Sequence, residues 1–264
     1  MFVENYKIYC GDCERVLEKD IKKNSIDLCI TSPPYNLNLG HNKYNKTPYD
    51  LYNDNKNHWE YITWLKKIFK KVYKVLRPGG RCVINIGDTK NGKIPLNSDI
   101  IQFMTKDLNY LIMTTIIWDK EHTNSITSWG SYCSPSSPSF PKPFEYILIF
   151  AKETRKLQYK GETDLTPDEF KKWAYGLWKF PGEQKLKKIG HPAVFPVELP
   201  YRLIKILSWK NSTILDPFCG SGTTGIASTI LNRKFVGIEI SKKYCEISKK
   251  RIESAIPIDI FKEN

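Results

Sequence analysis

Residues 212–225 read STILDPFCGSGTTG, and this stretch decides which fold we expect. The apolar residues Thr213–Leu215 predict a buried strand that ends at Asp216, and a glycine-rich turn separates this strand from a helical stretch, Gly225–Leu231. A strand, a glycine-rich turn and a helix in this order are typical of the nucleoside-binding part of an α/β sheet. The ligand is expected beyond the carboxyl end of the strand.

The charges around this turn narrow the choice of ligand. Gly220, Gly222 and Gly225 satisfy the pattern GxGxxG, and Glu239 ends the next apolar run with a carboxylate that can accept hydrogen bonds from ribose hydroxyls. A dinucleotide is disfavoured because the carboxylate of Asp216 would repel a pyrophosphate. S-adenosylmethionine has a ribose, no phosphate and a cationic end, and therefore fits better. The alternatives are a nicotinamide-dependent dehydrogenase and a tight turn that binds no ligand.

Apolar runs and helical patterns alternate along most of the chain, which predicts an α/β fold with a doubly wound, mostly parallel sheet and helices on both faces. The clearest helix spans about His58–Leu76, and Arg77–Gly80 (RPGG) is expected to end it and to turn the chain into the next strand. The runs expected to form strands are Lys7–Cys10, Ile26–Thr31, Arg81–Gly87, Leu111–Trp118, Tyr146–Ala151, Thr213–Leu215 and Lys234–Ile238.

A second candidate site lies in residues 27–36, which read DLCITSPPYN. Pro33 and Pro34 have fixed φ angles and leave rigid carbonyl acceptors at the end of a buried strand. The Ser32 hydroxyl and the Pro33 carbonyl can draw the hydrogens of a nucleobase amino group out of the ring plane, which restores the nucleophilicity of its nitrogen. Tyr35 can stack on a base that has been flipped out of DNA. The alternative is a Pro-Pro loop that only ends the strand.

Composition and charge favour an enzyme that acts on a polyanion. The 264 residues are 41% hydrophobic, enough for a sizeable core, and 41 Lys and Arg against 28 Asp and Glu give a net charge of +13. Such an excess favours nucleic acid as a partner, because each neutralised phosphate releases counterions. The alternative is a source organism whose proteins are generally rich in lysine.

The same sequence favours a cytoplasmic protein without a metal. No stretch approaches the roughly 20 apolar residues of a membrane span, and the N-terminal residues lack the apolar core of a signal peptide. Seven dispersed cysteines favour reduced thiols over a disulfide framework. Cys10 and Cys13 form a lone CxxC pair without a second ligand pair, so we expect no zinc site.

TSPPYN at 31–36 followed much later by DPFCGSGTT at 216–224 resembles the amino-methylating DNA methyltransferases of the N4-cytosine and N6-adenine family. The order of the two motifs is similar to the permuted order of the β group of that family, and the resemblance covers nearly the whole chain. His191–Pro196 (HPAVFP) is similar to the segment that closes over the methionine end of the cofactor. Gly11–Asp12 is similar to the strand-end motif at the adenine, and Leu76–Asp88 to the strand beside the catalytic one.

The resemblance implies a Rossmann-like, S-adenosylmethionine-dependent methyltransferase fold and direct transfer of the methyl group from sulfur to nitrogen. The residues that it and the motifs assign to the flipped base are Ser32, Pro33, Pro34 and Tyr35. Those assigned to the cofactor are Asp12, Thr31, His191, Ala193, Phe195, Asp216, Phe218, Gly220, Gly222, Thr223 and Glu239.

Ser32 favours cytosine N4 as the target, because serine opens the tetrapeptide in most cytosine enzymes of the family. Adenine N6 is the alternative within the family, and a catalytically inactive DNA-binding relative is the alternative outside enzymes. Cytosine C5 chemistry is disfavoured, since it uses a cysteine nucleophile, typically after a proline, and no cysteine of this chain follows a proline.

We expect one catalytic domain over residues 1–264, with residues 153–190 as a target-recognition insertion assisted by 36–57 and 120–143. Basic residues there would grip phosphates and aromatic residues would read bases, although Trp173 and Trp178 would alternatively pack in a small core of the insertion. The expected partner is double-stranded DNA in a prokaryotic cytoplasm, at the nucleoid. The resemblance also allows a homodimer and a separately encoded restriction endonuclease.

Overall fold

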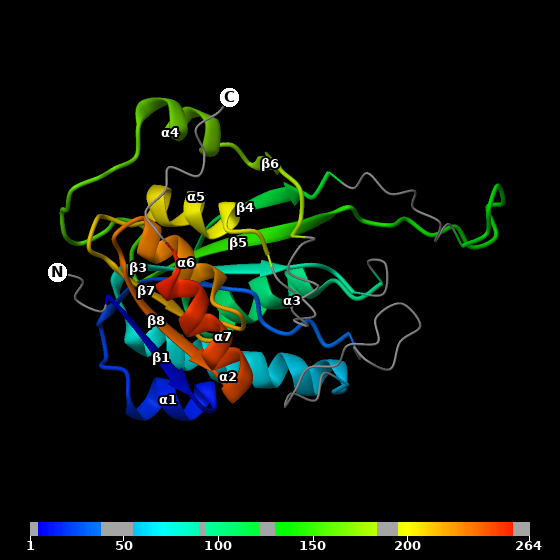
Figure 1. Cartoon of the computed structure of the whole chain (residues 1–264). Coiled ribbons are helices and arrows are strands. Elements are labelled where there is room, and N and C mark those ends of the chain that lie inside the picture. The colour runs from blue at the N-terminus through cyan, green and yellow to red at the C-terminus, as the bar shows by residue number, and fades with distance from the viewer. Residues whose placement is uncertain (1–4, 38–54, 90–92, 122–129, 184–194, 256–264) are drawn as a thin grey trace.

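The computed structural model of the chain describes residues 5–37, 55–89, 93–121, 130–183 and 195–255 (Figure 1). The strands are β1 (Tyr6–Cys10), β2 (Ile26–Thr31), β3 (Leu76–Ile86), β4 (Tyr110–Asp119), β5 (Phe144–Lys152), β6 (Leu177–Lys179), β7 (Thr213–Asp216) and β8 (Lys234–Glu239). The helices are α1 (Cys13–Lys19), α2 (His58–Val75), α3 (Leu96–Gln102), its π-helical continuation η2 (Phe103–Asp107), α4 (Pro167–Trp173), α5 (Glu198–Leu207), α6 (Thr223–Ile230) and α7 (Lys242–Glu253).

All described strands belong to one sheet with the order β1-β8-β7-β2-β3-β5-β4-β6. Only β5 runs antiparallel to its neighbours, because it follows β4 as a hairpin, so the doubly wound, mostly parallel sheet is confirmed. From β2 the chain winds through α2 to β3, and from β7 it winds the opposite way through α6 to β8. The carboxyl ends of β2 and β7 therefore flank the switch point of the sheet, where α/β proteins bind their ligands.

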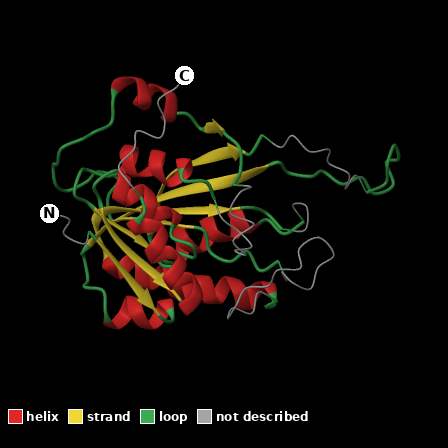
Figure 2. Cartoon of the chain, in the orientation of Figure 1, coloured by secondary structure: helices red, strands yellow, loops and turns green. Residues whose placement is uncertain are grey.

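Helices cover both faces of the sheet, as Figure 2 shows. On one face α1, α2, α3 and η2 bury their apolar side chains against alternate residues of the central strands, such as Cys82 and Ile84 of β3. On the other face α4, α5, α6 and α7 pack against the residues between them, such as Val83. The central strands are thus buried on both sides, which explains their nearly continuous apolar sequences.

The expected strands are all present, and most of their bounds shift by one or two residues. The main exception concerns RPGG, which we expected to form a turn between helix and strand. Helix α2 ends at Val75, and Arg77–Gly80 form an irregular stretch inside β3, between the pairs Ile26–Leu76 and Leu28–Arg81. The irregularity fits here because Gly79 takes a φ of +76°, and a β-carbon on it would lie 2.4 Å from the Lys156 carbonyl oxygen.

Residues 153–183 contain two features. Ion pairs of Glu162, Asp164 and Glu169 hold residues 162–169, here called the clasp, against the body of the protein. The strand β6, which we did not predict, follows the clasp. β6 pairs parallel with β4, and Trp178 stands opposite Trp118. Trp173 and Trp178 are buried in the same core as α5, so they pack neither in a small core of the insertion nor on an open surface. The indole nitrogen of Trp178 donates to the Trp173 carbonyl oxygen at 3.0 Å.

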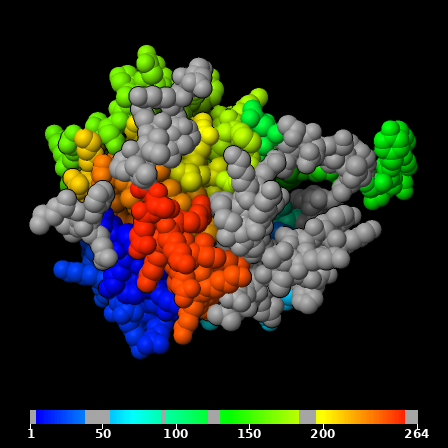
Figure 3. Space-filling view, viewed as in Figure 1, coloured from blue at the N-terminus to red at the C-terminus, as the bar shows by residue number. Residues whose placement is uncertain are grey.

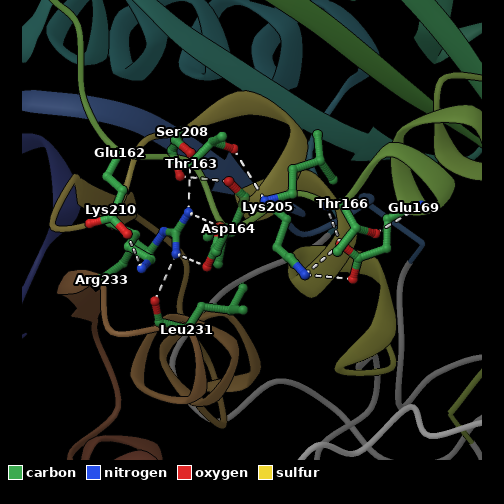
Figure 4. Close-up of polar contacts among 12 residues, drawn as sticks. Glu162, Thr163, Asp164, Thr166, Glu169, Lys205, Ser208, Lys210, Leu231 and Arg233 are labelled. Atoms are coloured by element: carbon green, nitrogen blue, oxygen red, sulfur yellow. Dashed lines mark hydrogen bonds and ion pairs between the residues drawn. The ribbon is translucent and has the colours of Figure 1, made fainter.

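Ion pairs hold the first half of this segment against the body of the protein (Figure 4). The guanidinium of Arg233 is fully buried and donates two hydrogen bonds to the carboxylate of Asp164. Lys205 of α5 reaches both oxygens of Glu169 at 2.5 and 2.6 Å, and Lys210 pairs with the exposed Glu162 at 2.5 Å. Burial alone would raise the pKa of Asp164, but the hydrogen bonds and charge of Arg233 hold this pKa below its usual value.

We expect Asp164→Asn to lower the free energy of unfolding by about 2–3 kcal/mol at neutral pH, because the buried Arg233 loses its charged partner but keeps one amide oxygen. The pKa of Asp164 is lower in the folded than in the unfolded chain, so its carboxylate stabilises the fold above about pH 4, the usual unfolded value. This contribution is lost as the pH falls through the folded pKa. Urea unfolding at about pH 7 and about pH 3 should therefore show the difference between the two proteins shrinking at the lower pH.

Glu162→Gln is the matched control, because it breaks the exposed pair with Lys210 and should change the free energy of unfolding by less than about 1 kcal/mol. An equal loss in the control, or a deficit of Asp164→Asn that stays constant at low pH, would contradict this account of the clasp.

Candidate active site

The carboxyl ends of four neighbouring strands, β1, β8, β7 and β2, are joined by hydrogen bonds around the switch point of the sheet. The backbones of β2 and β7 meet there, and the hydroxyl of Thr31 donates to Oδ1 of Asp216 at 2.7 Å. β8 ends beside β7 at Glu239, and the Gly11 amide after β1 donates to the Glu239 carbonyl oxygen at 2.8 Å. The two candidate motifs, far apart in the sequence, are thus in direct contact.

Asp216 organises the start of the glycine turn from inside the protein. Its Oδ1 also accepts from the Phe218 amide at 3.1 Å, and its Oδ2 accepts from the Thr224 hydroxyl at 2.7 Å. The pKa of this carboxyl is raised to about 6, because the effect of burial outweighs the opposite effect of the hydrogen bonds from Thr31, Thr224 and Phe218. Because these bonds engage both oxygens, the carboxylate shapes the turn and tethers it to β2.

Two of the three glycines of the turn are required by contacts within the protein. Gly222 has a φ of +83°, and a β-carbon on it would lie 2.3 Å from the Ser248 hydroxyl of α7. A β-carbon on Gly225 would lie 2.4 Å from Ile252 and 2.8 Å from Phe235. In nucleotide-binding turns such glycines let the ligand approach the backbone, but at these two positions the close neighbour is a side chain of α7 or β8.

Glu239 joins the glycine turn to the start of α7. Its Oε2 accepts from the Gly220 amide at 3.0 Å, and its Oε1 accepts from the Ser241 amide at 2.9 Å. Burial raises the pKa of this carboxyl, and these two backbone hydrogen bonds lower it. A carboxylate has about four acceptor positions, so each oxygen of Glu239 can accept a further hydrogen bond.

The other predicted cofactor residues surround this turn where the structure describes them. Asp12 is exposed and caps α1 by accepting from the Arg15 amide at 3.0 Å. Phe218 is partly buried, with its ring 5.6 Å from that of Trp64, and Phe195 packs beside α5. Thr223, in the first turn of α6, is buried, and its hydroxyl has no hydrogen-bond partner among the described residues. His191 and Ala193 lie outside the described residues.

The tetrapeptide after β2 is held by a polar network that we did not predict in full. The Ser32 hydroxyl donates to the Tyr35 hydroxyl at 3.0 Å, and the Tyr35 hydroxyl donates to Oε2 of Glu145 at 3.0 Å. Pro33 is buried, and the Pro34 carbonyl oxygen accepts from the Tyr61 hydroxyl at 2.7 Å. That carbonyl therefore already has a protein donor.

Asn85 of β3 and Glu145 of β5 are site residues that sequence reasoning missed. Asn85 Nδ2 lies 2.6 Å from Oε2 of Glu145 and 3.0 Å from the Tyr35 hydroxyl. Lys120, directly after β4, contacts Oε1 of Glu145 at 2.5 Å. One signal was available: Asn85 stands inside VINIG and Glu145 directly before YILIF, and a polar residue within an apolar strand needs a buried partner.

Residues 130–143, which precede β5, protrude from the body of the molecule at the edge of the sheet where the site lies (Figures 1 and 3). Tyr132 and Phe140 in this segment are 77% and 74% exposed, which is unusual for large aromatic side chains. Lys142 anchors the base of the segment to Asp88 at 2.6 Å.

The described parts of the chain contain no group of three or more His, Cys, Asp or Glu side chains that could hold a metal ion, and all seven cysteines are free. In the same residues, no helix has the length and apolar character needed to cross a membrane.

Comparisons with known proteins agree with the motifs. The family model for N6 and N4 methyltransferases, described as DNA methylase, matches residues 26–250. Type II methyltransferase M.MjaI of Methanocaldococcus jannaschii is 32% identical over 94% of this chain and 91% of its own length. Type II methyltransferase M.MjaVI of the same organism is 40% identical over 64% of this chain and 84% of its own length.

Among solved structures, TTHA0409 of Thermus thermophilus in complex with S-adenosyl-L-methionine is similar over 96% of this chain and 95% of its own, with a TM-score of 0.74 and 29% identity.

We expect Gly222→Ala to lower the free energy of unfolding by at least about 2 kcal/mol, because the added β-carbon meets Ser248 and the backbone is left-handed. Gly176→Ala is the matched control, since a β-carbon there has no neighbour within 4 Å; it should leave stability unchanged or raise it by up to about 1 kcal/mol. Chemical denaturation measures both. Equal effects of the two substitutions would show that the contact with α7 does not require a glycine.

Proposed function

Because the chain belongs to the N6 and N4 DNA methylase family, we propose that it transfers a methyl group from S-adenosyl-L-methionine to an exocyclic amino group of a base in double-stranded DNA. One observation carries this proposal: the hydrogen bond between Thr31 and Asp216 holds the tetrapeptide Ser32–Tyr35 against the glycine turn. A ligand on the turn and a base at the tetrapeptide would then lie together at one edge of the sheet.

The residues around the turn fit S-adenosyl-L-methionine. Glu239 keeps acceptor capacity for ribose hydroxyls, and the buried hydroxyl of Thr223, which has no partner among the described residues, suits a polar group of the ligand. Asp12 and Phe218 would lie toward its adenine, and Asp216 would act by holding the turn in shape. When bound, this cofactor supplies a methyl group that its sulfonium has already activated.

The tetrapeptide needs only to hold and orient the target amino group. Ser32 and the Pro33 carbonyl would accept its hydrogens, so that the nitrogen lone pair points out of the ring plane. Tyr35 would lie against the flipped base. The nitrogen then forms its bond to the methyl carbon as the carbon–sulfur bond breaks, and the amino group afterwards loses one proton to solvent.

We propose cytosine N4 as the target, on the serine at position 32. Adenine N6 is the second candidate, because a hydroxyl and a carboxylate can each accept from the same kind of amino group. Two of the relatives with which this chain aligns, M.MjaI and M.MjaVI, are Type II methyltransferases, and on this ground we place the enzyme in a restriction-modification system. A homodimer and a cognate endonuclease stay predictions.

For DNA contacts we propose the exposed segment 130–143 together with the predicted insertion 153–190. Within the insertion, Glu162, Asp164 and Glu169 are not candidates for DNA contacts, because they are already paired with the body of the protein. Tyr175, just before β6, and Leu177, its first residue, are exposed and are the better candidates for DNA contacts in this segment.

The first experiment incubates the purified full chain with labelled S-adenosyl-L-methionine and unmethylated genomic DNA, and separates the digested nucleosides by mass spectrometry. Labelled N4-methylcytosine is the expected product. N6-methyladenine would keep the mechanism and contradict the assignment from Ser32. Cofactor binding without any labelled nucleoside would contradict DNA methylation itself.

Ser32→Ala and Tyr35→Ala should each lower the rate of methyl transfer by at least about 100-fold, because each removes a contact to the reacting base. Both variants should bind S-adenosyl-L-methionine as the wild type does, since neither side chain belongs to the turn. Calorimetric titration with the cofactor checks this second point. Loss of cofactor binding in both variants would contradict the division between the two motifs.

A further inference from the structure

A network of hydrogen-bonded polar side chains connects the surface to Ser32 through an otherwise apolar face of the sheet. Its members are Lys120, Glu145, Asn85 and Tyr35. Asn85 follows Val83 by two positions and Glu145 precedes Ile147 by two, so both lie on the face covered by α5. The side chain of Glu145 is only 15% exposed and that of Lys120 21%. Polar groups buried in this way cost stability unless each is satisfied, so their presence needs a reason.

The donors and acceptors fix the direction in which the hydrogen bonds between Ser32 and Glu145 are donated. Glu145 has no proton to donate when ionised, so Oε2 accepts from both Tyr35 and Asn85, and Oε1 accepts from Lys120. The single proton of the Tyr35 hydroxyl faces Glu145 at 3.0 Å, with the Asn85 carbonyl oxygen farther away at 3.3 Å. The same hydroxyl accepts from the Asn85 amide and from Ser32. The proton of the Ser32 hydroxyl is therefore donated to Tyr35.

This direction decides what Ser32 can offer to a substrate. A hydroxyl has one proton and two lone pairs. Since the proton of Ser32 is committed to Tyr35 at 3.0 Å, its remaining hydrogen-bonding capacity is that of an acceptor. An acceptor is what a nucleobase amino group requires, because its nitrogen reacts only when its hydrogens are held out of the ring plane.

Asn85 donates to Tyr35 and Glu145 although its own side-chain oxygen is left without a hydrogen bond in the described part of the protein. Its side chain is 2% exposed, and its Oδ1 is buried without a hydrogen-bond partner among the described residues. Turning the amide over would give Glu145 and Tyr35 an acceptor in place of a donor. The orientation that leaves Oδ1 unpaired is the one that supplies donors to both.

We propose that Glu145 is a positioning residue for methyl transfer: its carboxylate takes the Tyr35 proton and thereby makes Ser32 an acceptor for the target amino group. This inference rests on the proposed function. Lys120 holds the outer oxygen of Glu145, and its own backbone amide donates to the Pro143 carbonyl oxygen at 3.1 Å. The network is therefore fastened at the base of segment 130–143, where we propose that DNA binds.

The test is Glu145→Gln in the full chain, with the rate constant of methyl transfer measured in single turnovers at saturating S-adenosyl-L-methionine and DNA. A glutamine has one acceptor oxygen facing three donors, from Tyr35, Asn85 and Lys120, so its NH2 group meets a donor in either orientation. We expect the rate constant to fall at least tenfold. The dissociation constants for cofactor and DNA should change less than threefold.

A second substitution should restore the rate constant of Glu145→Gln. If Glu145 had only a structural role, this substitution would not restore the rate constant. In Glu145→Gln with Lys120→Met, the outer donor is gone, so the glutamine oxygen can face Tyr35 and Asn85. This double variant should recover to within threefold of the rate constant of Lys120→Met alone, which keeps the carboxylate and is the reference for this comparison.

Tyr35→Phe tests whether Glu145 acts through Tyr35. The phenyl ring keeps the stacking surface and removes the hydroxyl between Glu145 and Ser32. If the effect passes through that hydroxyl, adding Glu145→Gln to Tyr35→Phe should change the rate constant less than twofold. Glu18→Gln, which breaks an exposed 2.5 Å pair between α1 and Lys71 of α2, is the control and should transfer methyl groups at the wild-type rate.

The outcomes separate this inference from the proposed function. A wild-type chain that methylates no DNA would overturn both. If the wild type is active, three results would overturn only this inference. Glu145→Gln could keep the wild-type rate constant, or its loss could lie wholly in the affinity for DNA. Alternatively, the effects of Tyr35→Phe and Glu145→Gln on the rate constant could multiply in the double variant. Melting temperatures of all variants, compared with the control, identify a loss that comes from unfolding, and the rescue is then judged on the folded double variant.

Discussion

The rest of the site depends on the hydrogen bond between Thr31 and Asp216. These residues are 185 positions apart in the chain, and the bond joins the ends of the adjacent strands β2 and β7. On one side of it β2 continues directly into Ser32, and on the other Asp216 directs the glycine turn through Phe218 and Thr224. Because the carboxylate is buried, it requires these donors, and the two motifs are fixed in one relative position.

The site combines carboxylates that differ in their surroundings. Burial raises the pKa of both Asp216 and Glu239, and hydrogen bonds from the protein lower both values. Asp216 is enclosed by its own fold, whereas Glu239 keeps acceptor positions for a ligand. Glu145 accepts hydrogen bonds from Lys120, from Tyr35 of the tetrapeptide and from Asn85 of β3. Each carboxylate therefore orders a different element: the turn, the start of α7 and the tetrapeptide.

The segment after β5, which we predicted to recognise DNA, is used largely for packing against the body of the protein. Aromatic residues among many charges suggested a DNA-reading surface, but Trp173 and Trp178 lie in the core beside α5. The charges of its first half are used by ion pairs with Lys205, Lys210 and Arg233 (Figure 4). The exposed aromatic residues of 130–143 lie instead at the edge of the sheet that carries the site.

The sequence by itself determined seven of the eight described strands, the doubly wound class of the sheet and both motifs, because strand periodicity, Pro-Pro after β2 and the glycine turn after β7 are local signals. It also pointed to Ser32–Tyr35 and Glu239. Only the tertiary structure decided that Asp216 faces Thr31, that Gly222 accommodates Ser248, and that Asn85 and Glu145 belong to the site. These facts depend on which strands become neighbours and on which side chains share a buried space. Such contacts join residues far apart in the chain. A polar residue within an apolar strand, such as Asn85, signals that a buried partner exists, but no local pattern says which residue that partner is.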